Sequence, residues 1–349
     1  METKVTLRAH CETASLFCQP LQSCLLMKTV LVTGSAGFIG HRVAHFLLDE
    51  GVNVIGLDNI NDAYDKRLKH HRQETLKDRR GFTFYEADLE NLGELKPIFE
   101  KHSFDVIYNL GARAGVRYSI EDPHVYMRSN TQGCLNILEL MHQHDCPKLV
   151  LASTSSLYAK QPMPFHEGLP VDQPLSPYAA SKKAAEVLAY TYHHIYGLDV
   201  TITRYFTVYG PAGRPDMAPF RFIKWIEEGT PITVFGDGTQ TRDFTYVDDI
   251  ARGTLLASKS LGHEVINLGG GKRPISLMDF IHKIEDRLGK KAEIVWKEMA
   301  ATEMIDTSAD IRKAKKMLDW EPQVDLDEGL DKTVEWYLGN LDWARDVEL

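Results

Sequence analysis

The chain has 349 residues, 43% of them hydrophobic, which is enough for a full core and two lobes. Its formal charge of −9 argues against nucleic-acid or anionic-membrane binding, and no apolar run approaches the roughly 20 residues that a membrane helix needs. None of the five cysteines has zinc-type spacing, so we expect no metal site, no disulfide framework and a reducing, cytoplasmic environment.

Residues 1–26 precede the first strand pattern and are followed by a second methionine, Met27. We expect them to be a disordered extension or the result of a start codon assigned too early, with a cleaved targeting peptide as the alternative.

Strand and helix patterns alternate from residue 28. We expect strands at 28–33, 53–57, 82–86, 104–109, 148–153 and 200–204, and helices at 38–50, 91–102, 124–144 and 178–196. This alternation predicts a parallel sheet covered on both faces, and right-handed crossovers make it a Rossmann-like, doubly wound α/β fold. Further helical patterns at 217–228, 276–288 and 326–338 predict a smaller lobe. We therefore expect a large domain over 27–205 and a smaller lobe over 206–349, with segments of the latter crossing back to the former.

The first strand ends in a glycine-rich turn of the form G-x-x-G-x-x-G, made by Gly34, Gly37 and Gly40. The turn follows an apolar strand and opens a helix, whose N-terminal N–H groups and dipole suit a pyrophosphate. Asp58 ends the second strand, where a carboxylate accepts hydrogen bonds from ribose hydroxyls and repels a 2′-phosphate. Asp58 taken alone also fits a turn residue, but with the glycines it predicts NAD. Asp88, after the third strand, is placed to meet the adenine amino group or to cap a helix.

A Y-x-x-x-K pattern, Tyr178 and Lys182, opens the long predicted helix. Spacing of four residues puts both side chains on one helix face. A neighbouring ammonium and a cationic nicotinamide ring would favour the tyrosine phenolate and lower its pKa toward working pH. Taken alone the pattern fits an ordinary helix, but Thr154 follows the fifth strand with a hydroxyl for a substrate oxygen. The glycine turn, Asp58, Thr154 and Y-x-x-x-K together indicate hydride chemistry.

With these motifs the chain resembles the extended short-chain dehydrogenase/reductase family of sugar-nucleotide epimerases and dehydratases, from Met27 to about Tyr337. Within the family it is most similar to the subgroup that epimerises UDP-glucuronate at C4. The segments that carry this similarity are 114–119, 126–130, 204–211, 213–217 and 242–249.

The resemblance implies roles for individual residues. The catalytic residues would be Thr154, Tyr178 and Lys182. The NAD contacts would be Gly34, Gly37, Phe38, Ile39, Gly40, Asp58, Asn59, Asp88, Leu89, Leu110, Ala112, Asn130, Tyr178, Lys182 and Tyr205. The UDP-sugar contacts would be Thr154, Ser155, Ser156, Thr207, Arg214, Val234, Phe235 and Arg242, with Val234 and Phe235 beside the uracil. Arginine forks suit phosphates, although Arg214 and Arg242 also fit surface salt bridges.

Several residues depart from the family pattern. Gly111 and Arg113 alter a loop after the fourth strand, and Ala159 replaces a usual glycine. Thr302 and Glu303 stand where the family usually has Gly-Asp. Ala300 stands where galactose-type epimerases carry a phosphate-binding arginine, which weakens the UDP-galactose interpretation.

Ser155 and Ser156 bear on the choice of reaction. Dehydratases place Asp-Glu directly after the catalytic threonine, and decarboxylases commonly carry a glutamate there, whereas a serine hydroxyl has no useful pKa for acid–base work. We therefore expect the 4-keto sugar to be turned over and reduced again, giving UDP-galacturonate from UDP-glucuronate. The alternatives are a UDP-glucose/UDP-galactose 4-epimerase, a UDP-glucuronate decarboxylase and a non-enzymatic NAD-binding regulator. The resemblance also implies a homodimer paired through helices 124–144 and 178–196, although their apolar faces also fit packing against the sheet.

Overall fold

Strands and helices alternate from Thr29 onward in the computed structural model, which describes residues 27–271, 274–298 and 306–349. The first elements are β1 (Thr29–Thr33), α1 (Phe38–Asp49), β2 (Asn53–Asp58), α2 (Lys66–Lys77), β3 (Phe82–Glu86), α3 (Leu92–Lys101), β4 (Val106–Asn109), α4 (Tyr118–Glu121), α5 (Pro123–Tyr126), a π-helix (Met127–Gln132), α6 (Gly133–Gln143), β5 (Lys148–Thr154), a 3₁₀-helix (Ser155–Tyr158), α7 (Pro177–Tyr196) and β6 (Asp199–Tyr205). They are followed by β7 (Thr207–Tyr209), α8 (Ala218–Glu228), β8 (Ile232–Phe235), β9 (Thr241–Arg242), β10 (Phe244–Tyr246), α9 (Val247–Leu256), β11 (His263–Leu268), β12 (Ile275–Ser276), α10 (Leu277–Leu288), β13 (Ile294–Lys297), α11 (Arg312–Leu318), α12 (Leu326–Gly339) and α13 (Leu341–Ala344).

The central sheet of the described chain has seven strands in the order β11-β6-β5-β4-β1-β2-β3. Every neighbouring pair in it is parallel, and the register pairs Thr33 with Leu57 and Thr154 with Tyr205. The order reverses beside β1, so the carboxyl ends of β1 and β4 open a crevice at the switch point. This confirms the Rossmann-like, doubly wound α/β fold.

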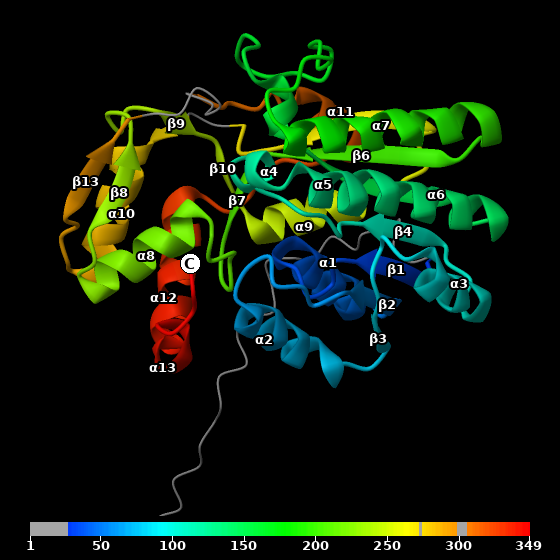
Figure 1. The fold of residues 1–349 in the computed structure, drawn as a ribbon, viewed down its shortest axis with the longest axis horizontal. Helices are drawn as coiled ribbons and strands as arrows, with labels where there is room; N and C mark the ends of the chain where they lie inside the picture. The colour runs from blue at the N-terminus through cyan, green and yellow to red at the C-terminus, as the bar shows by residue number, and fades with distance from the viewer. Residues whose placement is uncertain (1–26, 272–273, 299–305) are drawn as a thin grey trace, which may run out of the picture.

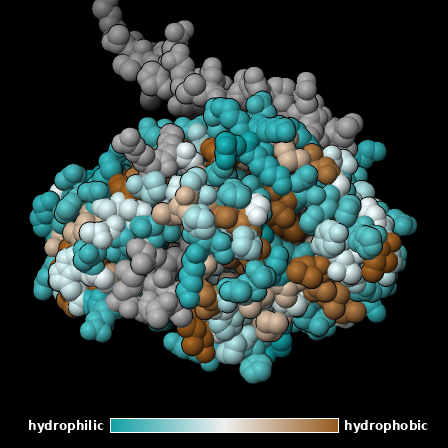
Figure 2. All heavy atoms as spheres, turned by 90° about the horizontal axis from the view of Figure 1, so that it is seen from above, coloured by the Kyte–Doolittle hydropathy of each residue, from teal (hydrophilic) through white to brown (hydrophobic). Residues whose placement is uncertain are grey.

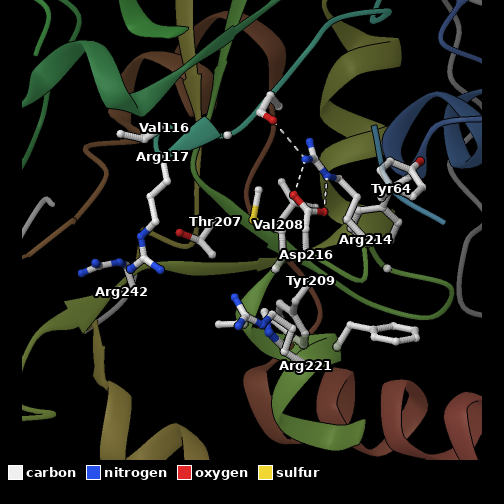
Figure 3. A pocket seen from close by; sticks show the side chains of 18 of the residues that line it. Tyr64, Val116, Arg117, Thr207, Val208, Tyr209, Arg214, Asp216, Arg221 and Arg242 are labelled. Carbon is white, nitrogen blue, oxygen red and sulfur yellow. Dashed lines mark hydrogen bonds and ion pairs between the residues drawn. The ribbon is translucent and has the colours of Figure 1, made fainter. Parts of the chain in front are cut away.

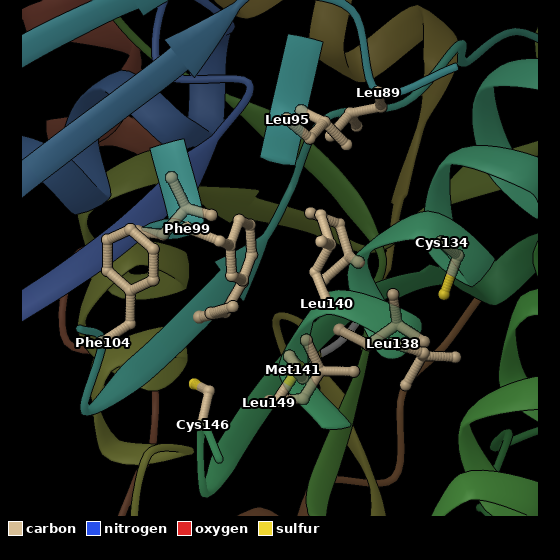
Figure 4. Close-up of a cluster of buried hydrophobic side chains, with 14 of the residues drawn as sticks. Leu89, Leu95, Phe99, Phe104, Cys134, Leu138, Leu140, Met141, Cys146 and Leu149 are labelled. Atoms are coloured by element: carbon tan, nitrogen blue, oxygen red, sulfur yellow. The ribbon is translucent and has the colours of Figure 1, made fainter. Parts of the chain in front are cut away.

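Two hydrophobic clusters cover the two faces of this sheet. One contains buried side chains of α1, α9 and α11. The other contains side chains of α3, α6 and α7 around Leu138 and Leu149, and Figure 4 shows part of it, with Phe99 and Phe104 packed edge to face. Because both faces are covered, the strands consist of nearly continuous apolar residues, which is why the sequence located them.

The second lobe has its own hydrophobic cluster, built from α8, α10, α12 and the strand β8. Figure 1 shows these elements beside the large sheet, with β8 and β13 at the outer side. Two segments after residue 205 return to the large lobe: β11 pairs with β6 at the edge of the sheet, and α9 packs with α1 in the cluster described above.

Two local predictions differ from the structure, and one helix was not predicted. The strand expected at 104–109 begins only at Val106. The helix expected at 124–144 is interrupted by the π-helix Met127–Gln132, whose extra residue per turn breaks the 3.6-residue period. Helix α2 was not predicted, because its sequence KRLKHHRQETLK is dominated by charged and histidine side chains and shows no apolar stripe.

The outer surface is mostly hydrophilic, and Figure 2 shows hydrophobic groups set singly or in small patches on one face. Large exposed hydrophobic residues include several on the π-helix and on α7: Met127, Val187, Tyr190, Ile195 and Tyr196. Among the described residues, no helix combines the length and apolarity that a membrane crossing requires.

Candidate functional site

A cavity of about 1150 Å³ separates the two lobes. Its wall combines strand ends of the large lobe with β7, α8 and β8–β10 of the smaller one. The predicted site residues that line it are Phe38, Ile39, Thr154, Ser155, Ser156, Tyr178, Tyr205, Thr207, Arg214, Phe235 and Arg242. Figure 3 shows Arg117, Thr207 and Arg242 on one side of this cavity and Arg214 with Asp216 on the other.

The glycine turn between β1 and α1 is closed around the carbonyl oxygen of Gly34. Gly34 has φ +70°, a conformation that L side chains rarely adopt. A Cβ on Gly40 would lie 2.1 Å from the Gly34 oxygen, and one on Gly37 would lie 2.9 Å from it. The turn therefore admits no side chain at these positions, and the N-terminus of α1, which begins at Phe38, is of the kind that suits a phosphate group. These features fit a dinucleotide.

Asp58 is buried at the end of β2 and braces this turn. Its Oδ2 accepts a hydrogen bond from the Ala36 N–H at 3.2 Å, and its Oδ1 accepts one from the Ile60 N–H at 2.9 Å. The Lys69 ammonium lies 3.7 Å from Oδ1. The adjacent Asn59 donates its side-chain amide to Asp88 at 2.8 Å. A carboxylate with an adjacent amide at this edge fits an adenosine ribose.

Except for Asn130, Tyr178 and Lys182, the remaining predicted cofactor residues lie along the ends of β3, β4 and β6. Leu89 follows β3 and is buried, whereas Leu110 and Ala112 follow β4. Asn130 lies within the π-helix, where its amide group bonds the backbone of Arg113 in both directions and donates to the Ser181 hydroxyl at 2.9 Å. The π-helix thereby ties the loop after β4 to α7.

Thr154, Tyr178 and Lys182 are brought together by β5 and α7. Helix α7 is set by Ser176, whose hydroxyl accepts from the Ala179 N–H at 3.2 Å, and it starts at Pro177. Tyr178 is therefore in the first turn and faces the cavity beside Thr154, the last residue of β5. Lys182, one turn further on, is only 5% exposed.

The electrostatics of this group differ in one respect from the sequence-based expectation. Burial raises the pKa of Tyr178, and the groups that oppose this rise are the Thr154 hydroxyl and the Arg214 guanidinium rather than Lys182. Burial lowers the pKa of Lys182 to about 8, against the opposing effects of Cys134 and Glu186. The described protein groups alone therefore do not bring the tyrosine pKa down.

A buried polar network underlies the three elements that carry these residues. Arg204 of β6 donates two hydrogen bonds to the Glu186 carboxylate of α7, at 2.9 and 2.7 Å. Ser153, next to Thr154, donates to the same carboxylate at 2.7 Å. Arg204 also donates to the Tyr158 hydroxyl at 2.8 Å, which anchors the 3₁₀-helix. Such fully paired buried groups hold β5, the 3₁₀-helix and α7 in one arrangement.

Further hydroxyl groups line the cavity together with Thr154 and Tyr178. Ser155 and Ser156 lie in the 3₁₀-helix, and the Ser156 N–H donates to the Thr154 hydroxyl at 3.1 Å. Thr207 of β7 faces the same cavity from the second lobe. Ala159, which directly follows the 3₁₀-helix, has φ −48°, so alanine is tolerated there in place of glycine.

Arg214, in the loop between β7 and α8, and Arg242, in strand β9, line the cavity from the second lobe. Arg214 makes a two-pronged ion pair with Asp216, at 3.0 and 2.6 Å, and donates to the Ala114 carbonyl at 3.1 Å. Arg242 donates to its neighbouring Thr241 carbonyl at 2.8 Å. Both side chains line the cavity, and Arg214 is at the same time ion-paired with Asp216.

The expectation for Val234 is corrected. Side chains alternate along β8, so Val234 is fully buried in the core of the second lobe, while Thr233 and Phe235 face the cavity. The side chain of Val234 is therefore not available to a substrate.

Several cavity residues were not assigned from the sequence. Arg117 packs over the Phe235 ring at 4.1 Å, and Arg221 of α8 packs over Trp225 at 4.4 Å. Tyr64, just before α2, also lines the cavity. Arg117 lay within a segment noted for its similarity, but Arg221 and Tyr64 gave no signal because the spacing of single residues does not show which lobe they face. Ala300, Thr302, Glu303 and residues 1–26 lie outside the described residues.

The model of the NAD dependent epimerase/dehydratase family matches residues 30–269. UDP-glucuronate 4-epimerase of Thermodesulfobacterium geofontis is 57% identical over 319 residues, which cover 91% of this chain and 99% of that protein. The crystal structure of UDP-glucuronic acid 4-epimerase from Bacillus cereus, in complex with UDP-glucuronic acid and NAD, aligns with a TM-score of 0.85 at 38% identity, covering 89% of this chain and 99% of that one. The UDP-glucose 4-epimerase of Thermotoga maritima, with UDP-glucose, aligns at 0.81 and 32% identity over 90% and 99%. This chain belongs to the NAD dependent epimerase/dehydratase family.

Proposed function

We propose that this chain interconverts UDP-glucuronate and UDP-galacturonate by NAD-dependent epimerisation at C4. The observation that carries the proposal is the set of hydroxyl side chains that line the cavity together with Tyr178, from Thr154, Ser155, Ser156 and Thr207, whereas elimination would need a carboxylate directly after Thr154. The cationic wall of the cavity also suits a ligand that carries a diphosphate and a carboxylate. The relatives named for UDP-glucuronate support the same substrate.

The cofactor would lie along the carboxyl ends of β1, β2 and β4, with its pyrophosphate at the glycine turn and its adenosine ribose at Asp58. The buried Lys182 would hold the nicotinamide ribose, and Asn130 would keep the adjoining loop in place. NAD supplies, when bound, the oxidant that accepts hydride from sugar C4 and gives it back. The large domain, 27–205, would thus be the cofactor domain, and 206–349 mainly the substrate lobe.

The chain's own residues would handle the proton and the sugar. Tyr178 takes the O4 proton and later returns it, while Thr154 holds O4 by a hydrogen bond. The Lys182 ammonium and the positive nicotinamide would supply the lowering of the tyrosine pKa that Thr154 and Arg214 only begin. Arg214 and Arg242 would bind the diphosphate, and Phe235 would flank the uracil.

The 4-keto uronate is a β-keto acid, which loses CO₂ when its carboxylate bond aligns with the carbonyl π system. Hydroxyl donors that hold the carboxylate out of this alignment would protect it, and Ser155, Ser156 and Thr207 face the cavity for this role.

The Thr207→Ala variant should therefore release more UDP-pentose per epimerisation than the unchanged protein. The ratio of UDP-pentose to UDP-galacturonate is measured by NMR, with Thr239→Ala, on an exposed turn of the second lobe, as the matched control. An unchanged product ratio in Thr207→Ala would contradict the protective role.

Separate incubations with UDP-glucuronate, UDP-glucose and UDP-xylose, with products identified by NMR, test the proposed function. We expect UDP-galacturonate from UDP-glucuronate. UDP-xylose and CO₂ as the main products would identify a decarboxylase instead, and epimerisation of UDP-glucose alone would identify a neutral-hexose epimerase. No conversion of any of the three would favour a non-enzymatic NAD-binding protein.

We further propose a homodimer formed through the π-helix, α6 and α7. Met127 of the π-helix and Val187 and Ile195 of α7 are 44%, 51% and 61% exposed, so these helices carry apolar side chains that the sheet does not cover. Sedimentation velocity should give twice the chain mass, and Val187→Lys with Ile195→Lys should shift it to that of a single chain.

The described cysteines, Cys134 and Cys146, are free, buried thiols, which suits a protein in the reducing environment of the cytoplasm.

A further inference from the structure

Arg72 of helix α2 is fully buried, yet it is neither one of the predicted catalytic residues nor one of the predicted NAD contacts. A guanidinium has five N–H donors. All five are used here: Nε and Nη2 donate to the Ala212 carbonyl at 3.0 and 2.7 Å, Nη2 to Gly213 at 3.2 Å, and Nη1 to the Ala36 carbonyl at 3.0 Å and the Tyr64 hydroxyl at 2.6 Å. The charge is thus solvated by carbonyl dipoles and a phenol, which is a costly arrangement to maintain.

The partners of Arg72 belong to two sites that are far apart in the sequence. Ala36 lies inside the glycine turn, between Gly34 and Gly37, and its N–H is held by Asp58. Ala212 and Gly213 directly precede Arg214. Ala212 has φ +51°, an unfavourable value for alanine, and both Nε and Nη2 of Arg72 hold its carbonyl in that conformation.

Tyr64 extends the same connection. Its ring lies under three cations, at 5.3 Å from the Lys69 ammonium and at 5.5 and 5.6 Å from the guanidinium carbons of Arg72 and Arg214. Figure 3 shows Tyr64 beside Arg214 at the cavity wall. One phenol therefore contacts the residue that reaches the cofactor turn and the residue proposed to bind the diphosphate.

We propose that Arg72 is a positioning residue that couples the cofactor site to the substrate site. A cofactor that orders the glycine turn fixes the position of the Ala36 carbonyl. Arg72, which is hydrogen-bonded to that carbonyl, then fixes the backbone of Ala212 and Gly213. The adjacent Arg214 is thereby aligned for the diphosphate. Binding of NAD and of a UDP-sugar is consequently cooperative, and by thermodynamic linkage each ligand tightens the other by the same factor. The inference rests on the proposed function insofar as Arg214 binds a nucleoside diphosphate.

The test measures UDP affinity by calorimetry in cofactor-free and in NAD-loaded protein. In the unchanged chain we expect NAD to tighten UDP binding by about fivefold or more. Arg72→Lys keeps the charge but has a single nitrogen, which cannot span Ala36 and Ala212, so the ratio should fall toward one. Arg79→Lys, whose guanidinium pairs with Asp49 at the surface beyond α2, is the matched control and should keep the unchanged ratio.

Tyr64→Phe gives a second, milder variant that removes one of the five hydrogen bonds and keeps the ring, and it should lower the ratio partially. A ratio near one in the unchanged chain, or an undiminished ratio in both Arg72→Lys and Tyr64→Phe, would overturn the coupling. Absence of UDP binding in either state would contradict the proposed function as well. Because UDP is common to all the candidate substrates, the result does not depend on which sugar is turned over.

Discussion

The Tyr178→Phe variant should lose activity by about 10²- to 10⁴-fold in kcat, the range that a positioned acid–base group contributes. The substitution removes only the hydroxyl that faces the cavity beside Thr154. The ring keeps its edge-on contact with Tyr126, at 6.0 Å between centroids, so the fold and the binding of NAD should be retained.

Steady-state kinetics with UDP-glucuronate measures this effect. Tyr192→Phe is the matched control, because its hydroxyl lies on the same helix α7 but bonds Glu139, away from the cavity. A Tyr178→Phe variant whose kcat stays within tenfold of the unchanged protein, with Tyr192→Phe equally active, would remove Tyr178 from the proton-transfer role.

Lys182→Met should abolish turnover and at the same time stabilise the cofactor-free protein at pH 7. Burial lowers the pKa of Lys182 to about 8 in the folded protein, against 10.5 for the ordinary side chain. The unfolded chain therefore binds more protons than the folded one between these values, so stability rises as the pH rises from about 8 to about 10.5. Below pH 8 the buried ammonium costs up to about 3 kcal/mol, which methionine does not incur.

Urea unfolding at pH 7 and at pH 10 checks this prediction. The gain from Lys182→Met should be largest at pH 7 and shrink at pH 10. Lys183→Met is the control, because the Lys183 side chain is 30% exposed and should give no comparable gain. A Lys182→Met protein that is less stable than the unchanged one at pH 7 would show that the ammonium is not an energetic cost of the site.

The parts of the fold that the sequence predicted are those with strong, local signals. The strands of the large lobe are short apolar runs because helices cover both faces of the sheet, and the glycine turn has a fixed spacing because Gly34, Gly37 and Gly40 pack against one another's backbone. The order of Thr154, Tyr178 and Lys182 along the chain predicted a shared site; in the structure Tyr178 lies beside Thr154 at the cavity, and Lys182 is buried one turn further along α7.

What the sequence left out depends on contacts between distant segments. Helix α2 buries Arg72 and Lys69 as well as Leu68 and Leu76, so its inner face is partly charged and carries no hydrophobic period. The π-helix, which contains the buried Asn130, has a wider turn than an α-helix, and a 3.6-residue period cannot reveal it. Val234 was assigned by resemblance, and only the observed alternation in β8 shows that it points into the core.

The measurement that tests the central claim most directly follows the hydrogen at sugar C4. UDP-glucuronate labelled with deuterium at C4 is incubated with the protein and the product is examined by NMR. If the hydride returns to the carbon it left, UDP-galacturonate should form with the deuterium retained at C4 and without consumption of added NAD. Replacement of the label by solvent hydrogen, or its release on the reduced cofactor with a 4-keto sugar as product and stoichiometric loss of NAD, would contradict this account.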